Sequence, residues 1–203
     1  MQKIIVASNN LHKISEIKKL LEGLEFEVKS LKDENIFVKV VEDGKTFEEN
    51  AKKKASEIAK FLKQRGEEQF IVLADDSGIA VDYLNGAPGI YSARYSGEHG
   101  NDAANNKKLL EGLRGVPREK RGARFICAIA LIDSEDTYTA VKGEVQGKIM
   151  EDLSGNGGFG YDPLFYYEPL KKTFSELSSE EKNEISHRGI AFKMLKERLS
   201  RYI

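Results

Sequence analysis

Apolar residues recur along this chain at spacings that alternate between those of strands and those of helices. The run QKIIVA at residues 2–7 predicts a short strand, and after the polar SNN the apolar positions of residues 11–21 follow helical spacing. Residues 26–31 and 36–41 are expected to form strands. The pattern therefore opens with a strand–loop–helix unit.

The next predicted helix has a clear start and stop. Thr46 and Glu49 match the T-x-x-E capping box that begins many helices. Apolar residues then recur on one face of the predicted helix, and Gly66 is the expected stop.

The rest of the chain continues the alternation of strands and helices. The expected elements are a strand over residues 70–74, a turn over 75–78, a strand over 79–83, a loop over 86–100, a helix over 102–112, strands over 122–132 and 137–149, a glycine-rich loop over 155–160 and a helical region from about 179 to 199. Several strands follow one another without a helix between them. The order therefore predicts an α/β fold with a mixed sheet rather than a doubly wound parallel one.

Length and composition indicate one globular domain over residues 1–203, with room for two lobes around a cleft. With 40% apolar residues, 32% charged residues and a net charge of −1, nothing points to a nucleic-acid or membrane partner. No apolar run approaches the roughly 18 residues of a membrane span, and no signal peptide is evident, so a cytoplasmic location is expected. The one cysteine, Cys127, is expected to be a buried strand residue.

Small polar residues and a lysine lie where the first strand gives way to a helix, at Ser8, Asn9, Asn10 and Lys13. Free backbone N–H groups and the helix dipole favour an anion there, and Lys13 adds a positive charge. The alternative is that Ser8 or Asn9 merely caps the helix. The position alone slightly favours the cap.

Asp75 and Asp76 directly follow an apolar stretch and are unexpected as packing residues. Carboxylates at a strand end can hold Mg²⁺ through oxygen ligands, and a nearby carboxylate can deprotonate an attacking water. The alternative is a solvated turn, which Asp-Ser-Gly sequences often form. Glu42 is a further carboxylate after an apolar run, and Lys54 lies on the capped helix.

Two segments of the second half are candidates for binding a base. The glycines around Phe159 let the backbone approach a flat ligand, and the ring offers a stacking surface, although a flexible turn with an aromatic plug is the alternative. Gly189 interrupts a helical pattern and indicates a break or a special backbone geometry there. The adjacent His187 and Arg188 are either hydrogen-bond donors to a carbonyl or surface residues.

Together, five segments resemble the inosine triphosphate pyrophosphatase family, also described as dITP/XTP pyrophosphatases. They are SNNLHK at 8–13, EDGKTFEENAKKKA at 42–55, ADDSGIAVDYLNGAPGIYSARYSG at 74–97, GFGYDPLF at 158–165 and ELSSEEKNEISHRG at 176–189. They follow the family's order over nearly the whole chain. One departure is Ser8-Asn9, where the family usually has Thr followed by a small residue, and the serine keeps the hydroxyl.

The resemblance implies an elongated α/β fold, in which helices flank a central mixed sheet and the active site lies in a cleft between two lobes, usually in a homodimer. The residues implied in substrate binding are Ser8, Asn9, Asn10, Lys13, Lys54, Ser77, Phe159, Gly160, Tyr161, Asp162, Lys182, His187 and Arg188. Glu42 and Asp76 are expected to hold Mg²⁺ with help from Asp75. Asp76 is the expected general base.

The implied reaction converts ITP, dITP and XTP to the monophosphate and pyrophosphate, and so removes deaminated purines from the nucleotide pool. A water held by Mg²⁺ is expected to attack the α-phosphorus. Donors from His187 and Arg188 would pair with the 6-keto oxygen of hypoxanthine or xanthine, whereas the 6-amino group of adenine would leave them unpaired. No residue is identified as the one that excludes GTP.

Two other functions remain as alternatives. One is a pyrophosphatase for modified pyrimidine nucleotides like the Maf-type proteins, whose first motif is rich in Ser and Arg and is unlike SNNLHK. The other is a nucleotide-binding sensor without catalysis. A sensor predicts the loss of a key carboxylate or lysine, yet Glu42, Asp76 and Lys13 are all present.

Overall fold

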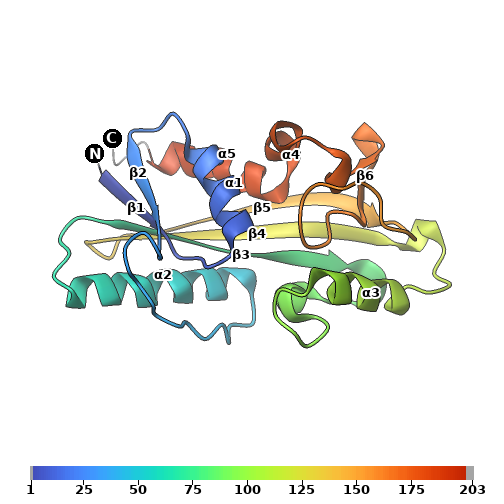
Figure 1. Cartoon of the computed structure of the whole chain (residues 1–203), viewed down its shortest axis with the longest axis horizontal. Helices are drawn as coiled ribbons and strands as arrows, with labels where there is room; N and C mark the ends of the chain where they lie inside the picture. The colour runs from blue at the N-terminus through green and yellow to red at the C-terminus, as the bar shows by residue number, and fades with distance from the viewer. Residues whose placement is uncertain (1, 200–203) are drawn as a thin grey trace. The chain divides into compact units, whose positions relative to one another are not determined.

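A seven-stranded mixed sheet is the centre of the fold in the computed structural model, which describes residues 2–199 (Figure 1). The strands are β1 (Gln2–Val6), β2 (Phe26–Ser30), β3 (Ile71–Val81), β4 (Gly122–Asp133), β5 (Tyr138–Ile149), β6 (Phe165–Tyr167) and β7 (Lys172–Thr173). Their order in the sheet is β2-β1-β3-β4-β5-β6-β7. Strand β1 pairs in parallel with β2 and β3, whereas β6 pairs antiparallel with β5 and β7. The predicted α/β fold with a mixed sheet is confirmed.

The α-helices of the described part are α1 (Leu11–Leu21), α2 (Phe47–Gln64), α3 (Asp102–Gly112), α4 (Ser179–Ile185) and α5 (His187–Leu199). Helix α2 starts as predicted, because the Thr46 side chain accepts a hydrogen bond from the Glu49 N–H at 3.1 Å. The return contact of the capping box is displaced by one residue, since Glu49 Oε2 accepts from the Lys45 N–H at 2.6 Å. None of the helices in residues 2–199 has the length and apolar character needed to cross a membrane.

Contacts divide the described residues into two compact units. Unit 1 comprises residues 2–76, 127–142 and 191–199, and unit 2 comprises residues 77–126 and 143–190. The long strands β3, β4 and β5 each contribute residues to both units. Both units are therefore assembled from separate stretches of sequence.

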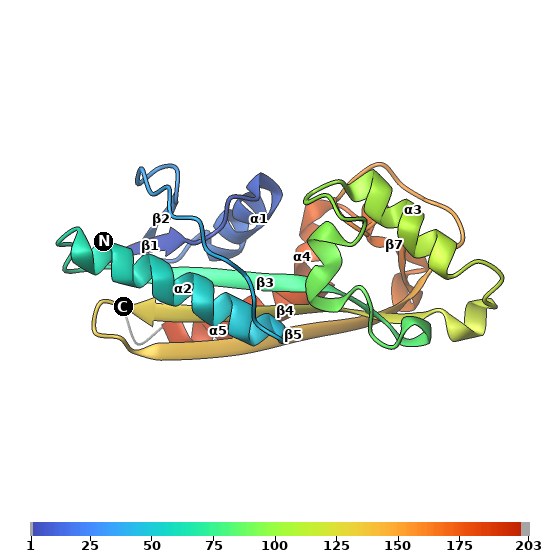
Figure 2. The ribbon, with the colours of Figure 1, turned by 90° about the horizontal axis from the view of Figure 1, so that it is seen from below.

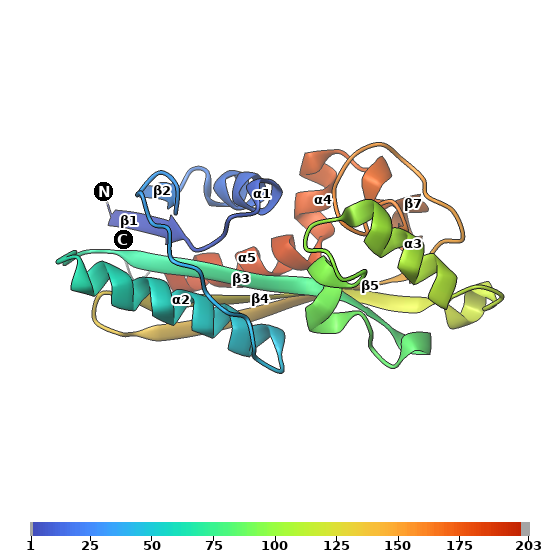
Figure 3. The same ribbon diagram turned by 60° about the horizontal axis from the view of Figure 1, so that its bottom comes forward.

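Unit 1 has helices on both faces of its strands, because successive strand residues point to opposite faces. In β1, Ile4 and Val6 pack in one hydrophobic cluster with residues of α1 and α5. Ile5, between them, packs in a second cluster with residues of α2. Figures 1 and 3 show α2 running along this part of the sheet. Cys127, in β4, is fully buried in the first cluster, as predicted.

Unit 2 has its own core, in which α3, the shared strands and the segment from β6 to α4 meet. Aromatic rings fill much of it: Phe165 lies 4.6 Å from Phe125 and 4.8 Å from Phe174 between ring centroids. Aromatic pairs at such separations contribute beyond the area that they bury. This core supports the loop over residues 155–162 and the start of α5.

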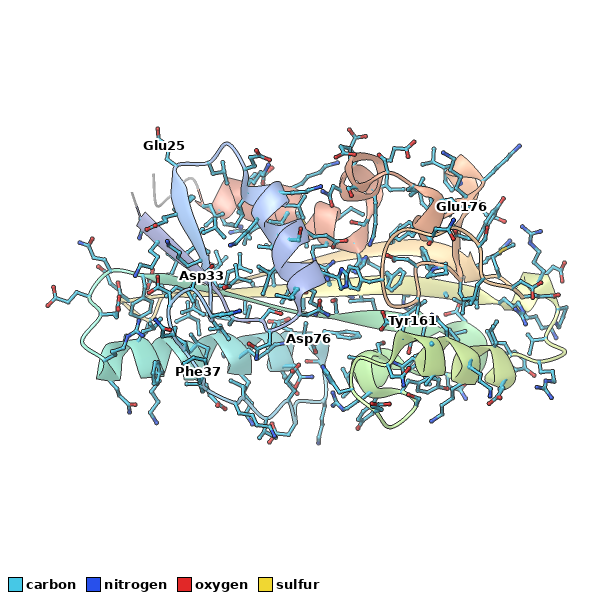
Figure 4. All side chains as sticks on the ribbon, viewed as in Figure 1. Glu25, Asp33, Phe37, Asp76, Tyr161 and Glu176 are labelled. Carbon is cyan, nitrogen blue, oxygen red and sulfur yellow. The ribbon has the colours of Figure 1, made fainter. Side chains whose placement is uncertain are left out.

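The predicted strand over residues 36–41 is wrong. The segment has no regular secondary structure and joins none of the strands described for the sheet. Val38 and Val40 pack against the α2 cluster, whereas Phe37 and Val41 are 83% and 61% exposed (Phe37 is labelled in Figure 4). Packing of alternate residues on one side reproduces the strand pattern without hydrogen bonding to a neighbouring strand.

The predicted turn over residues 75–78 is also wrong. Strand β3 runs without interruption from Ile71 to Val81, so Asp75 and Asp76 lie within a strand and not after one. Gly78 permits close packing there, since a Cβ atom on it would lie 2.7 Å from the Gly89 carbonyl oxygen. The DDSG sequence is therefore an acidic segment of a buried strand.

Candidate active site

Asn10 organises the loop between β1 and α1 through hydrogen bonds. Its Oδ1 accepts hydrogen bonds from the N–H groups of His12 and Lys13 at 3.0 and 3.2 Å, while Ser8 Oγ accepts from the Asn10 N–H at 3.2 Å. Asn10, and not Ser8 or Asn9, is the residue that caps α1. Ser8 is half-buried and Asn9 is exposed, which leaves both accessible beside the helix N-terminus.

Lys13 and Lys54 bring their ammonium groups to the acidic part of β3. Lys13 Nζ lies 3.2 Å from Asp75 Oδ2. Lys54 Nζ lies 2.9 Å from Glu42 Oε2 and 3.7 Å from Asp76 Oδ1. Unit 1 thus gathers five of the predicted charged residues around β3: Lys13, Glu42, Lys54, Asp75 and Asp76.

Asn50, one turn before Lys54 on α2, links two parts of this cluster. Its Nδ2 donates to Asp76 Oδ2 at 3.0 Å, and its Oδ1 accepts from the Gly44 N–H at 2.8 Å. Asn50 is fully buried. It was not predicted as a site residue, although its position four residues before Lys54 places both on one helix face.

Burial and charge shift the proton affinities of this cluster. Burial raises the pKa of Asp76 above its ordinary value, and the neighbouring Lys54 and Lys13 only partly oppose this. Burial disfavours the charged form of Lys54, but Asp76, Asp75 and Glu42 outweigh it, so the pKa of Lys54 is raised. Asp76 is therefore a better base than an exposed aspartate, beside a lysine that stays charged.

The donor set suits a hard divalent cation. Glu42, Asp75 and Asp76 supply carboxylate oxygens, the ligands that Mg²⁺ prefers, and Asp75 and Asp76 are 1% and 7% exposed. Within residues 2–199, however, no three His, Cys, Asp or Glu side chains are already gathered as a metal site. Glu42 and Asp76 meet instead at the Lys54 ammonium. The chemistry of these residues fits the ion, but the lysines now neutralise the carboxylates.

In unit 2, two cationic side chains approach the ring of Phe159. Lys182 Nζ lies 4.7 Å and Arg188 Cζ 5.8 Å from the ring centroid. Asp162 Oδ2 accepts hydrogen bonds from Lys182 Nζ at 2.6 Å and from the Phe159 N–H at 2.9 Å. Phe159 is half-buried, whereas Asp162 and Lys182 are almost fully buried.

The helix break lies at Ser186, three residues before the expected Gly189. Helix α4 ends at Ile185, and Ser186 Oγ accepts from the Gly189 N–H at 3.1 Å in the first turn of α5. A Cβ atom on Gly189 would lie 1.8 Å from the Asn183 carbonyl oxygen, so only glycine fits the close approach of the two helices.

The break orients His187 and Arg188, both buried, at the start of α5. The His187 ring stacks on Phe125 with 4.7 Å between centroids and 11° between planes. Arg188 Nη2 donates to Ser77 Oγ at 3.0 Å. Unit 2 therefore connects Ser77, Phe159, Asp162, Lys182 and Arg188, and Phe125 supports His187, a role that the sequence pattern did not reveal.

Tyr161 has a different environment from the residues around it. Its ring is buried in the core of unit 2, and its hydroxyl donates to the Ser92 carbonyl at 2.8 Å (Tyr161 is labelled in Figure 4). Burial raises the pKa of its hydroxyl. These contacts are typical of a packing residue, and its contact with substrate stays a prediction.

Comparison with known proteins identifies the family of the chain. The model of the Ham1 family matches residues 4–198. The dITP/XTP pyrophosphatase of Clostridium perfringens is 56% identical over 199 residues, which are 98% of each chain. The structure of the Staphylococcus aureus Ham1 protein superposes with a TM-score of 0.86 at 40% identity and covers 100% of both chains. A Mycobacterium abscessus structure titled nucleoside-triphosphatase / dITP/XTP pyrophosphatase has a TM-score of 0.74 at 44% identity, covering 95% of this chain and 98% of its own. The chain belongs to the Ham1 family.

Proposed function

We propose that the protein hydrolyses dITP, XTP and ITP to the nucleoside monophosphate and pyrophosphate. The observation that carries the proposal is the pair of buried carboxylates in β3, Asp75 and Asp76, each beside a lysine ammonium. Such groups suit a reaction in which a polyanion is bound and a water is deprotonated. The names of the relatives support the same reaction, and ITP carries the same base as dITP.

The triphosphate is the proposed ligand of the loop before α1 and of the lysines. Ser8, Asn9 and Asn10 precede the helix N-terminus, where backbone N–H groups and the helix dipole favour phosphate. Lys13 and Lys54 are each paired with a carboxylate now. A polyanionic substrate competes for these lysines and leaves the carboxylate oxygens available.

Glu42 and Asp76, assisted by Asp75, are the proposed holders of Mg²⁺. When bound, the ion offsets the negative charge of the phosphates and lowers the pKa of a water molecule. Asp76 accepts the proton of the attacking water, and its raised pKa suits it to that task. The oxygen of that water forms a bond to the α-phosphorus, and the bond to the pyrophosphate oxygen breaks. Lys13 and Lys54 stabilise the charge that develops on the leaving group.

The base is the proposed ligand of unit 2. Phe159 provides the stacking surface, and the main chain at Gly160 and Tyr161 together with Asp162 borders it. Lys182 closes over the purine, and His187 and Arg188, with backbone N–H groups, provide donors for the 6-keto oxygen. Adenine presents an amino group there, which cannot accept a hydrogen bond from these donors, and the missing hydrogen bond costs about 1–3 kcal/mol.

A homodimer is proposed as the assembly, as the family resemblance implies. Sedimentation velocity checks this: a species of twice the 22.8 kDa chain mass is expected, and a monomer at every concentration contradicts it. The cytoplasmic location stays a prediction.

Product analysis tests the proposed reaction. ITP, XTP, GTP and ATP are each incubated with protein and Mg²⁺, with and without a chelator, and the products are separated by anion exchange. We expect IMP and XMP with pyrophosphate, dependent on Mg²⁺ and formed far faster than the products of GTP or ATP. Orthophosphate with a diphosphate would show that the attacked phosphorus is another one. No turnover at all would favour the non-catalytic sensor.

A further inference from the structure

Helix α3 holds both backbone groups of Gly160, the residue after Phe159. The Gly160 N–H donates to Asp102 Oδ2 at 2.7 Å, and Asn106 Nδ2 donates to the Gly160 carbonyl at 2.9 Å. Asp102 and Asn106 are four residues apart on α3, so they lie on one helix face. Figures 2 and 3 show the loop after β5 passing beside α3. We call Asp102 and Asn106 the α3 clamp.

Asn106 makes this contact at a cost to the folded state. It is 6% exposed, and within the described residues its Oδ1 is a buried atom that has no hydrogen-bond partner. A leucine of similar size would avoid leaving a polar atom unsatisfied. What asparagine supplies there is the hydrogen bond to Gly160.

Phe159 is consequently fixed on both sides along the chain. The Phe159 N–H donates to Asp162 Oδ2 at 2.9 Å. Gly160, which follows, has a φ of +64° and is held by the α3 clamp. With the backbone fixed, only the two side-chain torsions of Phe159 are left to vary. The ring is therefore preorganised, in the sense that binding a base does not have to order the backbone that carries it.

We propose that Asp102 and Asn106 are positioning residues for purine recognition, which hold Gly160 so that the Phe159 ring is ready to stack on the base. This inference rests on the proposed function, in which Phe159 contacts the base. A preorganised stacking surface binds the base without ordering the loop at that moment. Neither clamp residue needs to touch the substrate.

Three variants separate the hydrogen bonds from other effects. Asn106→Leu removes the donor and keeps the branched shape of the side chain. Asp102→Ala removes the acceptor, whereas Asp102→Asn removes the charge near the α3 N-terminus and keeps an acceptor oxygen. The matched control is Asn105→Leu, because Asn105 is also buried on the same helix but has other partners. Its Oδ1 accepts from the Ser96 N–H at 2.7 Å, and its Nδ2 donates to the Ala93 carbonyl at 3.4 Å.

The first readout is the KM for ITP. We expect Asn106→Leu and Asp102→Ala to raise the KM for ITP by about tenfold and to leave kcat near the wild-type value, because substrate binding loses a preorganised stacking surface. Asp102→Asn and Asn105→Leu are expected to retain the wild-type KM. A merely structural role would lower kcat through loss of folded protein and leave KM unchanged, and that result would overturn the proposal.

The second readout needs no turnover. The chain contains no tryptophan, so Phe159→Trp introduces a single indole whose fluorescence anisotropy decay reports motion at that position. In this background Asn106→Leu is expected to increase the amplitude of nanosecond motion, and Asn105→Leu is not. If Asn106→Leu does not fold, Asp102→Ala compared with Asp102→Asn decides the matter.

The two readouts distinguish the two ways of failing. Unchanged indole motion in the Asn106→Leu and Asp102→Ala variants would overturn the positioning role of the α3 clamp, even if the wild type hydrolyses ITP. A wild type that does not hydrolyse ITP, together with increased indole motion in the clamp variants, would contradict the proposed function and support the clamp.

Discussion

At the scale of single residues, Asp76 combines burial with a position between Asn50 and Lys54. Because Asn50 Nδ2 donates to Asp76 Oδ2, an asparagine at position 76 keeps the size but cannot accept a proton. We expect Asp76→Asn to lower kcat for ITP by about 100-fold or more, since a general base contributes at least that much. Isothermal titration with IMP should show binding within a few-fold of wild type.

The control for Asp76→Asn is Asp136→Asn, which changes an exposed aspartate paired with Lys63 at 2.7 Å. Its kcat should equal that of the wild type. A near-normal kcat in Asp76→Asn would refute the role of Asp76 as base.

His187 is the second residue whose contacts suggest a specific effect. Its ring is stacked on Phe125 and is buried, so it can present a donor in a fixed direction. We expect His187→Ala to lower the ratio of kcat/KM for ITP to kcat/KM for ATP by about tenfold, because one donor to the 6-keto oxygen is lost. His99→Ala changes an exposed histidine and should leave the ratio as it is. An unchanged ratio in His187→Ala would place the discrimination elsewhere.

At the scale of elements, the junction of α4 and α5 depends on one glycine. A Cβ atom on Gly189 would lie 1.8 Å from the Asn183 carbonyl oxygen. Neither the Asn183 carbonyl nor the Gly189 backbone can move away without shifting a helix. We expect Gly189→Ala to reduce the free energy of unfolding by about 3 kcal/mol or more. Urea denaturation measures it.

Gly112, the last residue of α3, is the matched control for Gly189. Its nearest neighbour to an added Cβ is Leu84 Cδ2 at 3.6 Å, an ordinary contact. Gly112→Ala should leave stability unchanged or raise it by up to about 1 kcal/mol. Equal stability of Gly189→Ala and wild type would show that α4 and α5 separate easily.

The turn after β2 makes stability depend on pH. Asp33 Oδ2 accepts from the Ser30 N–H at 2.8 Å, and the hydrogen bonds from Ser30 and Lys18 lower the pKa of Asp33 to about 2 (Asp33 is labelled in Figure 4). A lowered pKa stabilises the folded state above the unfolded pKa near 3.8, and this contribution is lost as the pH falls towards 2.

Asp33→Asn should therefore reduce the free energy of unfolding at pH 7, by less than about 1 kcal/mol because Asp33 is partly exposed. The difference from wild type should shrink between pH 4 and pH 2, as urea curves at several pH values would show. Asp152→Asn, at another exposed aspartate, serves as control. A difference that does not change with pH would mean that the charge of Asp33 is irrelevant.

Local patterns predicted the elements whose signals lie within one turn or one strand. Helix α2 follows from Thr46, its apolar stripe and Gly66, and α3 was predicted at its observed bounds. Strand β3 did not follow, because DDSG is a turn sequence when read locally. The lysines that neutralise its aspartates come from positions 13 and 54, which a local pattern does not connect.

The residues of the candidate site were predictable where the residue type itself points to chemistry. Charged and aromatic residues such as Lys13, Asp76 and Phe159 stand out by type, and the family resemblance implies a role for each of them. Asn50, Asp102 and Asn106 act through partners 26, 58 and 54 residues away. A polar residue in a helix indicates nothing about such a partner until the fold is known.

At the scale of the whole molecule, the shared strands predict cooperative unfolding. Because β3, β4 and β5 each supply residues to both units, neither unit can lose its strands while the other keeps them. Scanning calorimetry should show one transition with equal calorimetric and van't Hoff enthalpies. Two resolved transitions would contradict this.

The interleaving of the two units also constrains how the protein can be made. The ribosome delivers residues in sequence at roughly 5–20 per second, and a domain usually folds once its last residue has emerged. Here unit 1 begins with β1 but is closed by residues of α5, which follow the whole of unit 2 in the sequence. The face of β1 that packs against α5 is therefore completed, in a growing chain, only after all of unit 2 has been synthesised. Until then Ile4 and Val6, which face α5, can be covered only in part, by packing against α1.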